Sequence, residues 1–338
     1  MKRTLFVAFL LATLAVTAGA QGTVLLNAAG ATFPYPIYSK WFDVYHTAHP
    51  DVQINYQSIG SGGGIRQLLA GTVDFGASDG PMSDDQLAQA KFKILHFPTV
   101  LGAVVPTYNV PGVSGELNFT QKAIAGIYLG TITKWNDPEI ANANKGVSLP
   151  NADIVVVHRS DGSGTTYIFT DFLAKASDDW KNKVGKGTSV NWPVGLGGKG
   201  NEGVTGLVKQ TPGSIGYIEL IYAVQNNIPY GKVQNAAGKF VKADLVGVTA
   251  AAAGSGKEIP DDFRVSITNA PGAASYPVSS FTWLLIPAQI QDAKKRDAIK
   301  GFIKWMLNDG QSYNEGLSYA KLPKNVVAKE VKAISLIQ

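Results

Sequence analysis

The chain has 338 residues, of which 45% are hydrophobic and 16% charged, and its formal net charge is +5. Its basic residues are interspersed with acidic ones and form no stripe, which excludes the phosphate-neutralising surface of a nucleic-acid-binding protein. It contains no cysteine. This absence excludes a disulfide framework and also excludes lipid attachment to a cysteine exposed by processing.

The first twenty residues, MKRTLFVAFLLATLAVTAGA, have the pattern of an export signal. Lys2 and Arg3 precede an apolar run over residues 5–16, and this run is shorter than the roughly 18 apolar residues that a membrane span needs. We therefore expect cleavage near Ala20 and export to the periplasm, not as a lipoprotein. Loss of the two basic residues lowers the net charge from +5 to +3, and the length that is left favours two domains.

Short apolar segments rich in β-branched residues alternate with segments whose apolar residues recur at helical spacing. The strand-like segments, in chain order, are 52–60, 68–78, 94–109, 153–160, 214–220 and 282–287. The helix-like segments are 36–48, 64–71, 121–130, 166–176, 201–210 and 294–309. Such alternation is typical of α/β layers with parallel or mixed sheets. Residues 247–260, rich in Ala and Gly, predict a flexible surface excursion or a short helix.

Three glycine-rich turns with hydroxyl-bearing residues lead into predicted helices. In chain order they contain Thr32 and Phe33, then Ser61, then Ser163, Gly164 and Thr165. A helix start leaves backbone N–H groups unpaired and carries the positive end of the helix dipole, so each turn is a potential anion site. Ordinary N-capping explains any one of them. Three together, with Arg159 just before the third, favour a shared small oxyanion.

Asp79, in the segment VDFGASDGPM, places a negative charge beside this predicted anion site. A carboxylate repels an anion unless the anion carries a proton that the carboxylate accepts. Phosphate carries protons near neutral pH, whereas sulfate carries none, so Asp79 would select phosphate over sulfate. A plain capping or turn role before Gly80 and Pro81 is the alternative.

Several segments together resemble the phosphate-binding protein of the high-affinity phosphate ABC transporter. They include AAGATFPYPIYSKW, YQSIGSGGGIRQLLAGTVDFGASDGPMS, RSDGSGTTYIFTDFL, GSIGYIEL and YPVSSFTWLLI. The resemblance extends from about residue 28 to residue 325. It implies a non-enzymatic, two-domain (type II) periplasmic binding protein of the α/β class, each domain a mixed central sheet flanked by helices. Such a protein closes on inorganic phosphate in an interdomain cleft and delivers it to a membrane permease powered by an ATPase.

The resemblance also implies a discontinuous domain I over residues 21–99 and 278–338 and a domain II over residues 100–277. The chain would cross between them near 97–102 and 276–280, where a hinge absorbs closure. Carried over by position, the phosphate-binding residues are Thr32, Phe33 (through its backbone N–H), Ser61, Asp79, Arg159, Ser163, Gly164 and Thr165. Asp161 would orient Arg159, no cofactor or metal is implied, and the protein would be a monomer. Gly62 stands where a second serine is common, which removes a hydroxyl from the pocket edge.

Three other patterns are weaker. The segment GLGGKG (195–200) has the glycines of a dinucleotide fingerprint, but Trp192 and Pro193 interrupt the strand that must precede it, and we expect Asn201 to cap the next helix instead. Ser163 lacks the G-x-S-x-G pattern of a hydrolase, and only His158 has an evident path to it. The histidines show no metal-ligand spacing.

A hydrolase of phosphate esters, capture of arsenate, and signalling without transport are the alternative functions.

Overall fold

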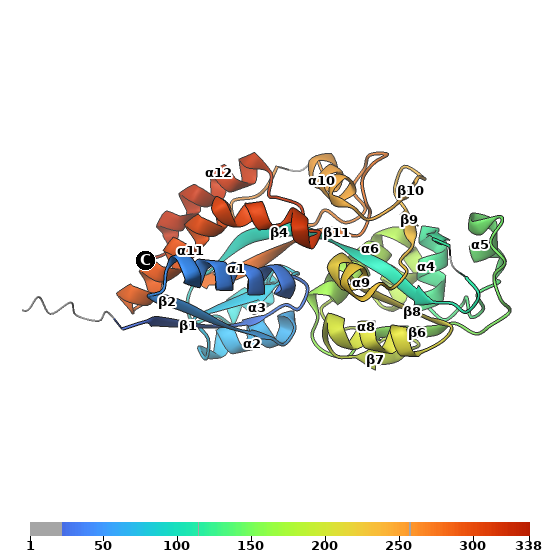
Figure 1. The fold of residues 1–338 in the computed structure, drawn as a ribbon, viewed down its shortest axis with the longest axis horizontal. Helices are drawn as coiled ribbons and strands as arrows, with labels where there is room; N and C mark the ends of the chain where they lie inside the picture. Colours follow the sequence, from blue (N-terminus) through green and yellow to red (C-terminus); the bar gives the residue numbers. More distant parts are fainter. Residues whose placement is uncertain (1–21, 114, 257) are drawn as a thin grey trace, which may run out of the picture.

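The computed structural model describes residues 22–113, 115–256 and 258–338; the predicted export signal at residues 1–20 lies outside them. The molecule is elongated, with two halves side by side along its long axis (Figure 1). An eight-stranded sheet runs through both halves in the order β2-β1-β3-β11-β4-β8-β6-β7. Its strands are β1 (Val24–Gly30), β2 (Val52–Ser58), β3 (Phe75–Ser78), β4 (Ile94–Asn109), β6 (Val155–Arg159), β7 (Leu196–Gly198), β8 (Ser214–Glu219) and β11 (Ser279–Pro287).

Strand β4 joins the two halves because it pairs with a different strand at each end. Residues from Ile94 to Ala103 pair with β11, and residues from Val104 to Asn109 pair with β8, both antiparallel. In contrast, β1 is parallel to β2 and β3, and β6 is parallel to β7 and β8. The α/β class with mixed sheets is therefore confirmed, and the sheets of the two halves are continuous through β4. A smaller sheet combines β5 (Asn118–Phe119), β9 (Lys232–Gln234) and β10 (Phe240–Val241).

The helices cover both faces of the sheet. They are α1 (Tyr35–Ala48), α2 (Ser61–Ala70), α3 (Asp84–Ala88), α4 (Gln121–Tyr128), α5 (Pro138–Ala141), α6 (Gly164–Ala176), α7 (Asp178–Lys183), α8 (Gly200–Gln210), α9 (Leu220–Asn226), α10 (Leu245–Gly254), α11 (Ala293–Leu307) and α12 (Lys324–Ala333). Within the part of the chain that the structure describes, none of them is long and apolar enough to cross a membrane.

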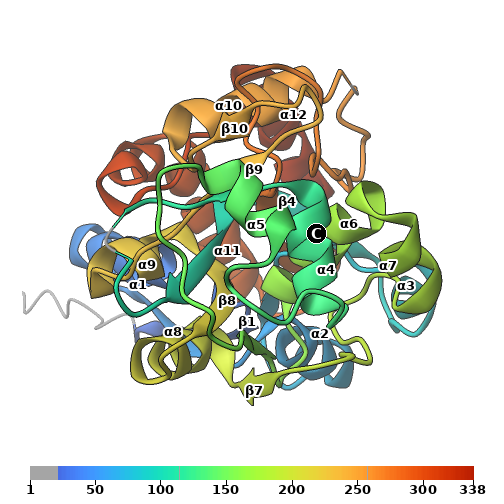
Figure 2. The same cartoon turned by 90° about the vertical axis from the view of Figure 1, so that its right-hand side faces the viewer.

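Neighbouring residues of β8 show how the second half is layered, because successive side chains of a strand point to opposite faces. Tyr217 stacks on Phe169 of α6, with ring centroids 4.4 Å apart. The position of Gly216 faces α8, where an added Cβ would lie 2.9 Å from Val204 Cγ1. Helices α6 and α8 therefore lie on opposite sides of β8, as Figure 2 shows. In the first half, Phe42 of α1 packs against Phe302 of α11 (5.3 Å between centroids).

Most predicted strands and helices are present with boundaries shifted by a few residues. The strand-like segment 68–78 is wrong in its first part, because residues 68–70 belong to α2 and only β3 (Phe75–Ser78) is a strand. Of the two structures predicted for residues 247–260, the short helix forms as α10, whose first turn is capped by Asp244 accepting from Gly247 N. Strand β1 was not predicted. Its sequence VLLNAAG lacks a clear alternation, yet it lies between β2 and β3, where both of its edges are paired.

Candidate functional site

The three predicted turns all lie at the starts of helices that follow strands of the sheet. Thr32 lies between β1 and α1, Ser61 is the first residue of α2, and Ser163 caps α6. The capping prediction is confirmed for Ser163, whose Oγ accepts from Thr166 N at 3.0 Å. Ser61 instead uses its Oγ to accept from Asp79 N at 3.2 Å. Helix starts from both halves thus carry the hydroxyls that the sequence singled out.

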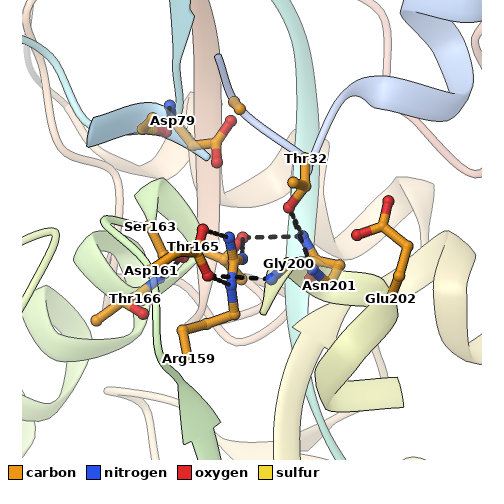
Figure 3. Close-up of polar contacts among 12 residues, drawn as sticks. Thr32, Asp79, Arg159, Asp161, Ser163, Thr165, Thr166, Gly200, Asn201 and Glu202 are labelled. Carbon is orange, nitrogen blue, oxygen red and sulfur yellow. Dashed lines mark hydrogen bonds and ion pairs between the residues drawn. The ribbon is translucent and has the colours of Figure 1, made fainter. Parts of the chain in front are cut away.

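The structure brings these residues into one buried region, which we call the polar cluster. It comprises Thr32, Ser61, Asp79, Arg159, Ser163, Gly164, Thr165 and Asn201. All are buried, and each residue other than Gly164 is at most 3% exposed. Thr32 and Asp79 come from the first half, whereas Arg159, Ser163 and Thr165 come from the second, and they face one another (Figure 3). Residues that are distant in sequence therefore meet where the two halves adjoin.

The carboxylate of Asp79 has one satisfied and one unsatisfied oxygen. Thr282 Oγ1 of β11 donates to Oδ1 at 2.8 Å, while Oδ2 is buried without a hydrogen-bond partner. Burial raises the pKa of Asp79 to about 7, against the opposing effects of the Thr282 bond and the charge of Arg159. An orphaned carboxylate oxygen inside a protein is costly unless a donor reaches it, so Oδ2 is a prepared acceptor.

Arg159 supplies the positive charge of the cluster, and Asp161 holds it in place. Its Nε donates to Asp161 Oδ1 at 2.8 Å and its Nη2 to Oδ2 at 2.6 Å, while Nη1 donates to Thr165 Oγ1 at 3.3 Å. Burial works against ionisation of Asp161, but the bonds from Arg159 and from Gly200 N keep its pKa below the ordinary value. The pair fixes the guanidinium geometry, as predicted for Asp161.

Two glycines allow the halves to approach closely. A Cβ on Gly164 would clash with Ser61 Oγ and Asp79 Oδ2 across the boundary between the halves. Gly62 N donates to Gly162 O at 2.9 Å, and a Cβ on Gly62 would lie 3.0 Å from Gly162 Cα. Gly62 therefore has a steric role at the contact between the halves, beyond the loss of a hydroxyl that the sequence indicated.

Phe33 follows Thr32, and its side chain packs into the core of the first half. Its ring is fully buried and lies 6.3 Å from the ring of Tyr319, and its carbonyl accepts from Tyr319 Oη at 2.6 Å. The ring also blocks the space beside Gly102, where a Cβ would clash with it. The aromatic side chain thus anchors the turn to the core of the first half, which leaves residue 33 only its main chain for contacts in the cluster.

Sequence reasoning missed the place of Asn201 in the polar cluster, and it missed Thr282, which donates to Asp79. Asn201 was predicted to cap α8, which is wrong: the N-cap position is Lys199, without a side-chain capping bond. The Asn201 amide instead donates to Thr32 Oγ1 and Thr165 Oγ1 at 2.8 and 3.1 Å. The sequence did contain a signal for Asn201, because GLGGKGN is a fourth glycine-rich segment that leads into a helix, like the three turns above.

The weaker patterns have structural explanations. His158 stacks on Trp192, with ring centroids 4.9 Å apart, and its Nδ1 faces Arg159 O, so it is not placed as a base for Ser163. Strand β7 lies inside the GLGGKG segment and not before it, which does not match a dinucleotide fingerprint. Among the described residues, no group of three His, Cys, Asp or Glu side chains is arranged to hold a metal ion.

Comparisons with known proteins identify the family. The family model of the PBP superfamily domain matches residues 15–310. The chain is 46% identical to the phosphate-binding protein PstS of Xylella fastidiosa over 92% of this chain and 85% of the relative. It is 44% identical to the protein of the same name from Pasteurella multocida over 97% and 94%.

The fold agrees with these relationships. A putative phosphate ABC transporter substrate-binding protein from Clostridium perfringens, solved with bound phosphate, superimposes with a TM-score of 0.65. It shares 20% identity and covers 89% of this chain and 100% of its own. At that identity the likeness concerns the fold alone, whereas the sequence relationships above cover nearly the whole chain. The chain belongs to the PBP superfamily and, within it, to the family of the phosphate-binding proteins PstS.

Proposed function

We propose that this protein captures inorganic phosphate and delivers it to the permease of an ABC transporter for import. Its relatives carry the name phosphate-binding protein, and the polar cluster has the chemistry that a protonated oxyanion requires. One observation carries the proposal: Asp79 Oδ2 is a buried acceptor without a partner, in the same buried cluster as Ser61, Arg159 and Thr165. A proton-bearing anion satisfies this oxygen, and an anion without protons does not.

In this proposal the ligand-binding residues are Thr32, Phe33, Ser61, Asp79, Arg159, Ser163, Gly164 and Thr165, with Asp161 in support. Arg159 brings the one formal positive charge to the ligand, but Asp161 already balances it. The remaining attraction comes from the starts of α2 and α6 and from neutral hydroxyls. Such dipoles act strongly because the cluster is shielded from water.

The proposed binding event is a closure of two domains over the anion. Domain I comprises residues 21–99 and 278–338 and domain II residues 100–277. The change of pairing partner along β4, between Ala103 and Val104, supports a hinge in this strand. The hydrogen bond from Gly62 N to Gly162 O is one that closure would make and opening would break. Export to the periplasm, a monomeric state and docking to the permease subunits complete the proposal.

Arsenate is a second ligand that this chemistry favours, because it carries protons as phosphate does and Asp79 Oδ2 accepts from either anion. Hydrolysis of phosphate esters is not favoured, because Ser163 Oγ accepts from Thr166 N and His158 lies against Trp192. A serine nucleophile needs a base within hydrogen-bond reach. The proposed role is therefore binding and transfer of an intact anion.

Isothermal titration of the mature, phosphate-stripped protein tests the proposal directly. We expect tight one-to-one binding of phosphate, competition by arsenate and no binding of sulfate. In Asp79→Asn the ratio of phosphate to sulfate affinity should fall by about a hundredfold, because an amide presents a donor in place of the acceptor. Asp171→Asn, which alters another buried carboxylate, serves as the control and should leave the ratio unchanged. An equal ratio of phosphate to sulfate affinity in Asp79→Asn and the wild type would show that Asp79 does not accept the ligand's proton.

A further inference from the structure

Asn201 belongs to the polar cluster but is not among the proposed phosphate-binding residues. It is fully buried at the start of α8, and both of its amide hydrogens are used within the cluster. One is donated to Thr32 Oγ1 of the first half at 2.8 Å and the other to Thr165 Oγ1 of the second half at 3.1 Å (Figure 3). A single side chain therefore connects hydroxyls from both halves.

The orientation of the Asn201 amide is fixed by a group that can only donate. Glu219 N donates to Asn201 Oδ1 at 2.9 Å, so the oxygen must face Glu219 and the nitrogen must face the two threonines. Glu219 is itself held, because its Oε2 caps α9 by accepting from Ile221 N at 2.6 Å. A flipped amide would set two donors against each other at Glu219 and is excluded.

The fixed orientation of the Asn201 amide determines which hydrogen bonds the hydroxyls of Thr32 and Thr165 can still make. A hydroxyl has one donor hydrogen and accepts two hydrogen bonds. Thr32 Oγ1 accepts from both Asn201 N and Asn201 Nδ2. Thr165 Oγ1 accepts from Arg159 Nη1 and Asn201 Nδ2. With both acceptor positions filled, each threonine has only its O–H hydrogen left to offer to another partner.

We propose that Asn201 is a positioning residue that makes the hydroxyls of Thr32 and Thr165 obligate donors toward the bound oxyanion. The inference rests on the proposed function, and it explains selectivity as well as affinity. With these hydroxyls held as donors, Asp79 is the acceptor for the ligand's proton. Since the bonds join the two halves, the same amide also favours the closed arrangement.

The first test measures phosphate affinity by isothermal titration for wild type, Asn201→Ala and Asn144→Ala. Asn144 is the matched control: it is buried, and its side chain makes three hydrogen bonds to main-chain atoms of Asn118 and Ile140, outside the polar cluster. We expect Asn201→Ala to weaken phosphate binding by about tenfold or more. Asn144→Ala should lower the melting temperature and keep the wild-type affinity. An unchanged affinity in Asn201→Ala would overturn the inference.

The second test separates positioning from a general structural effect. If Asn201 acts through Thr32, the loss in Asn201→Ala combined with Thr32→Val should be smaller than the product of the two single losses, by about threefold or more. Losses that simply multiply would overturn the inference. Circular dichroism checks folding, and Asn201→Leu, which keeps most of the volume without the donors, replaces Asn201→Ala in both tests if alanine does not fold. No phosphate binding by the wild type would instead overturn the proposed function, and the inference with it.

Discussion

Thr282 Oγ1 donates a 2.8 Å hydrogen bond to Asp79 Oδ1, and this bond divides the carboxylate into a structural oxygen and a free one. Thr282 is in β11, the strand that pairs with β3, whose end precedes Asp79. The sheet itself therefore orients the carboxylate before any ligand is present. The consequence is that a buried acidic group is retained at a cost to the stability of the ligand-free protein.

That cost predicts a pH-dependent stability. Burial raises the pKa of Asp79 from its ordinary value of 3.8 to about 7. The contribution of Asp79 to the free energy of unfolding is therefore fully present below pH 3.8. It is lost as the pH rises through about 7, because the buried carboxyl then has to ionise. At about pH 8, phosphate-stripped Asp79→Asn should be more stable than the wild type, by at most about 4 kcal/mol. Urea unfolding at several pH values checks this, and a gain that does not shrink toward about pH 4 would contradict it.

Arg159→Ala should weaken phosphate binding by about a hundredfold or more, because it removes the charge and leaves the half-buried Asp161 without its ion-pair partner. The measurement is the dissociation constant at fixed ionic strength. Arg264→Ala is the control, since Arg264 is likewise an arginine in ion pairs, with Asp84 and Asp262, but at the surface. It should keep the wild-type affinity. Equal affinities for Arg159→Ala and the wild type would remove Arg159 from the site.

Gly164→Ala should reduce phosphate affinity by about tenfold or more, because the new methyl group meets Ser61 Oγ and Asp79 Oδ2 when the halves adjoin. Gly206→Ala is the control. It lies inside α8 with open space around its Cβ position, so it should bind normally and gain about 0.5–1 kcal/mol of stability from helix propensity. Titration and urea unfolding of both variants check the pair, and wild-type affinity in Gly164→Ala would contradict the steric argument.

Glu330→Met should stabilise the protein without affecting binding. Glu330, on α12, is fully buried and neither carboxyl oxygen has a partner; burial raises its pKa well above the ordinary value. Its favourable contribution is present below its unfolded pKa and is lost as the pH rises through the folded one. Near neutral pH, an apolar side chain of similar volume should therefore add about 1–4 kcal/mol to the free energy of unfolding. A destabilised variant in urea unfolding at that pH would disprove this.

The residues found from the sequence are those whose signal is local. Ser163 was found because a hydroxyl before a helix is a cap, and Arg159 because it ends a strand beside that cap. Asn201 was noticed for the same local reason but was given the wrong role. Its partner Thr32 lies 169 positions earlier in the chain, and no pattern within one segment specifies such a contact.

Hydrophobic periodicity, turn composition and charge determined the α/β class, the positions of most helices and strands, and the kinds of groups that an anion site would contain. These properties are local because they depend on backbone geometry over a few residues. The tertiary structure decided which oxygen of Asp79 stays free, which donors fill the acceptor positions of the two threonine hydroxyls, and how closely Gly164 approaches Asp79. These depend on distances between chain segments that only the packing of the two halves brings together.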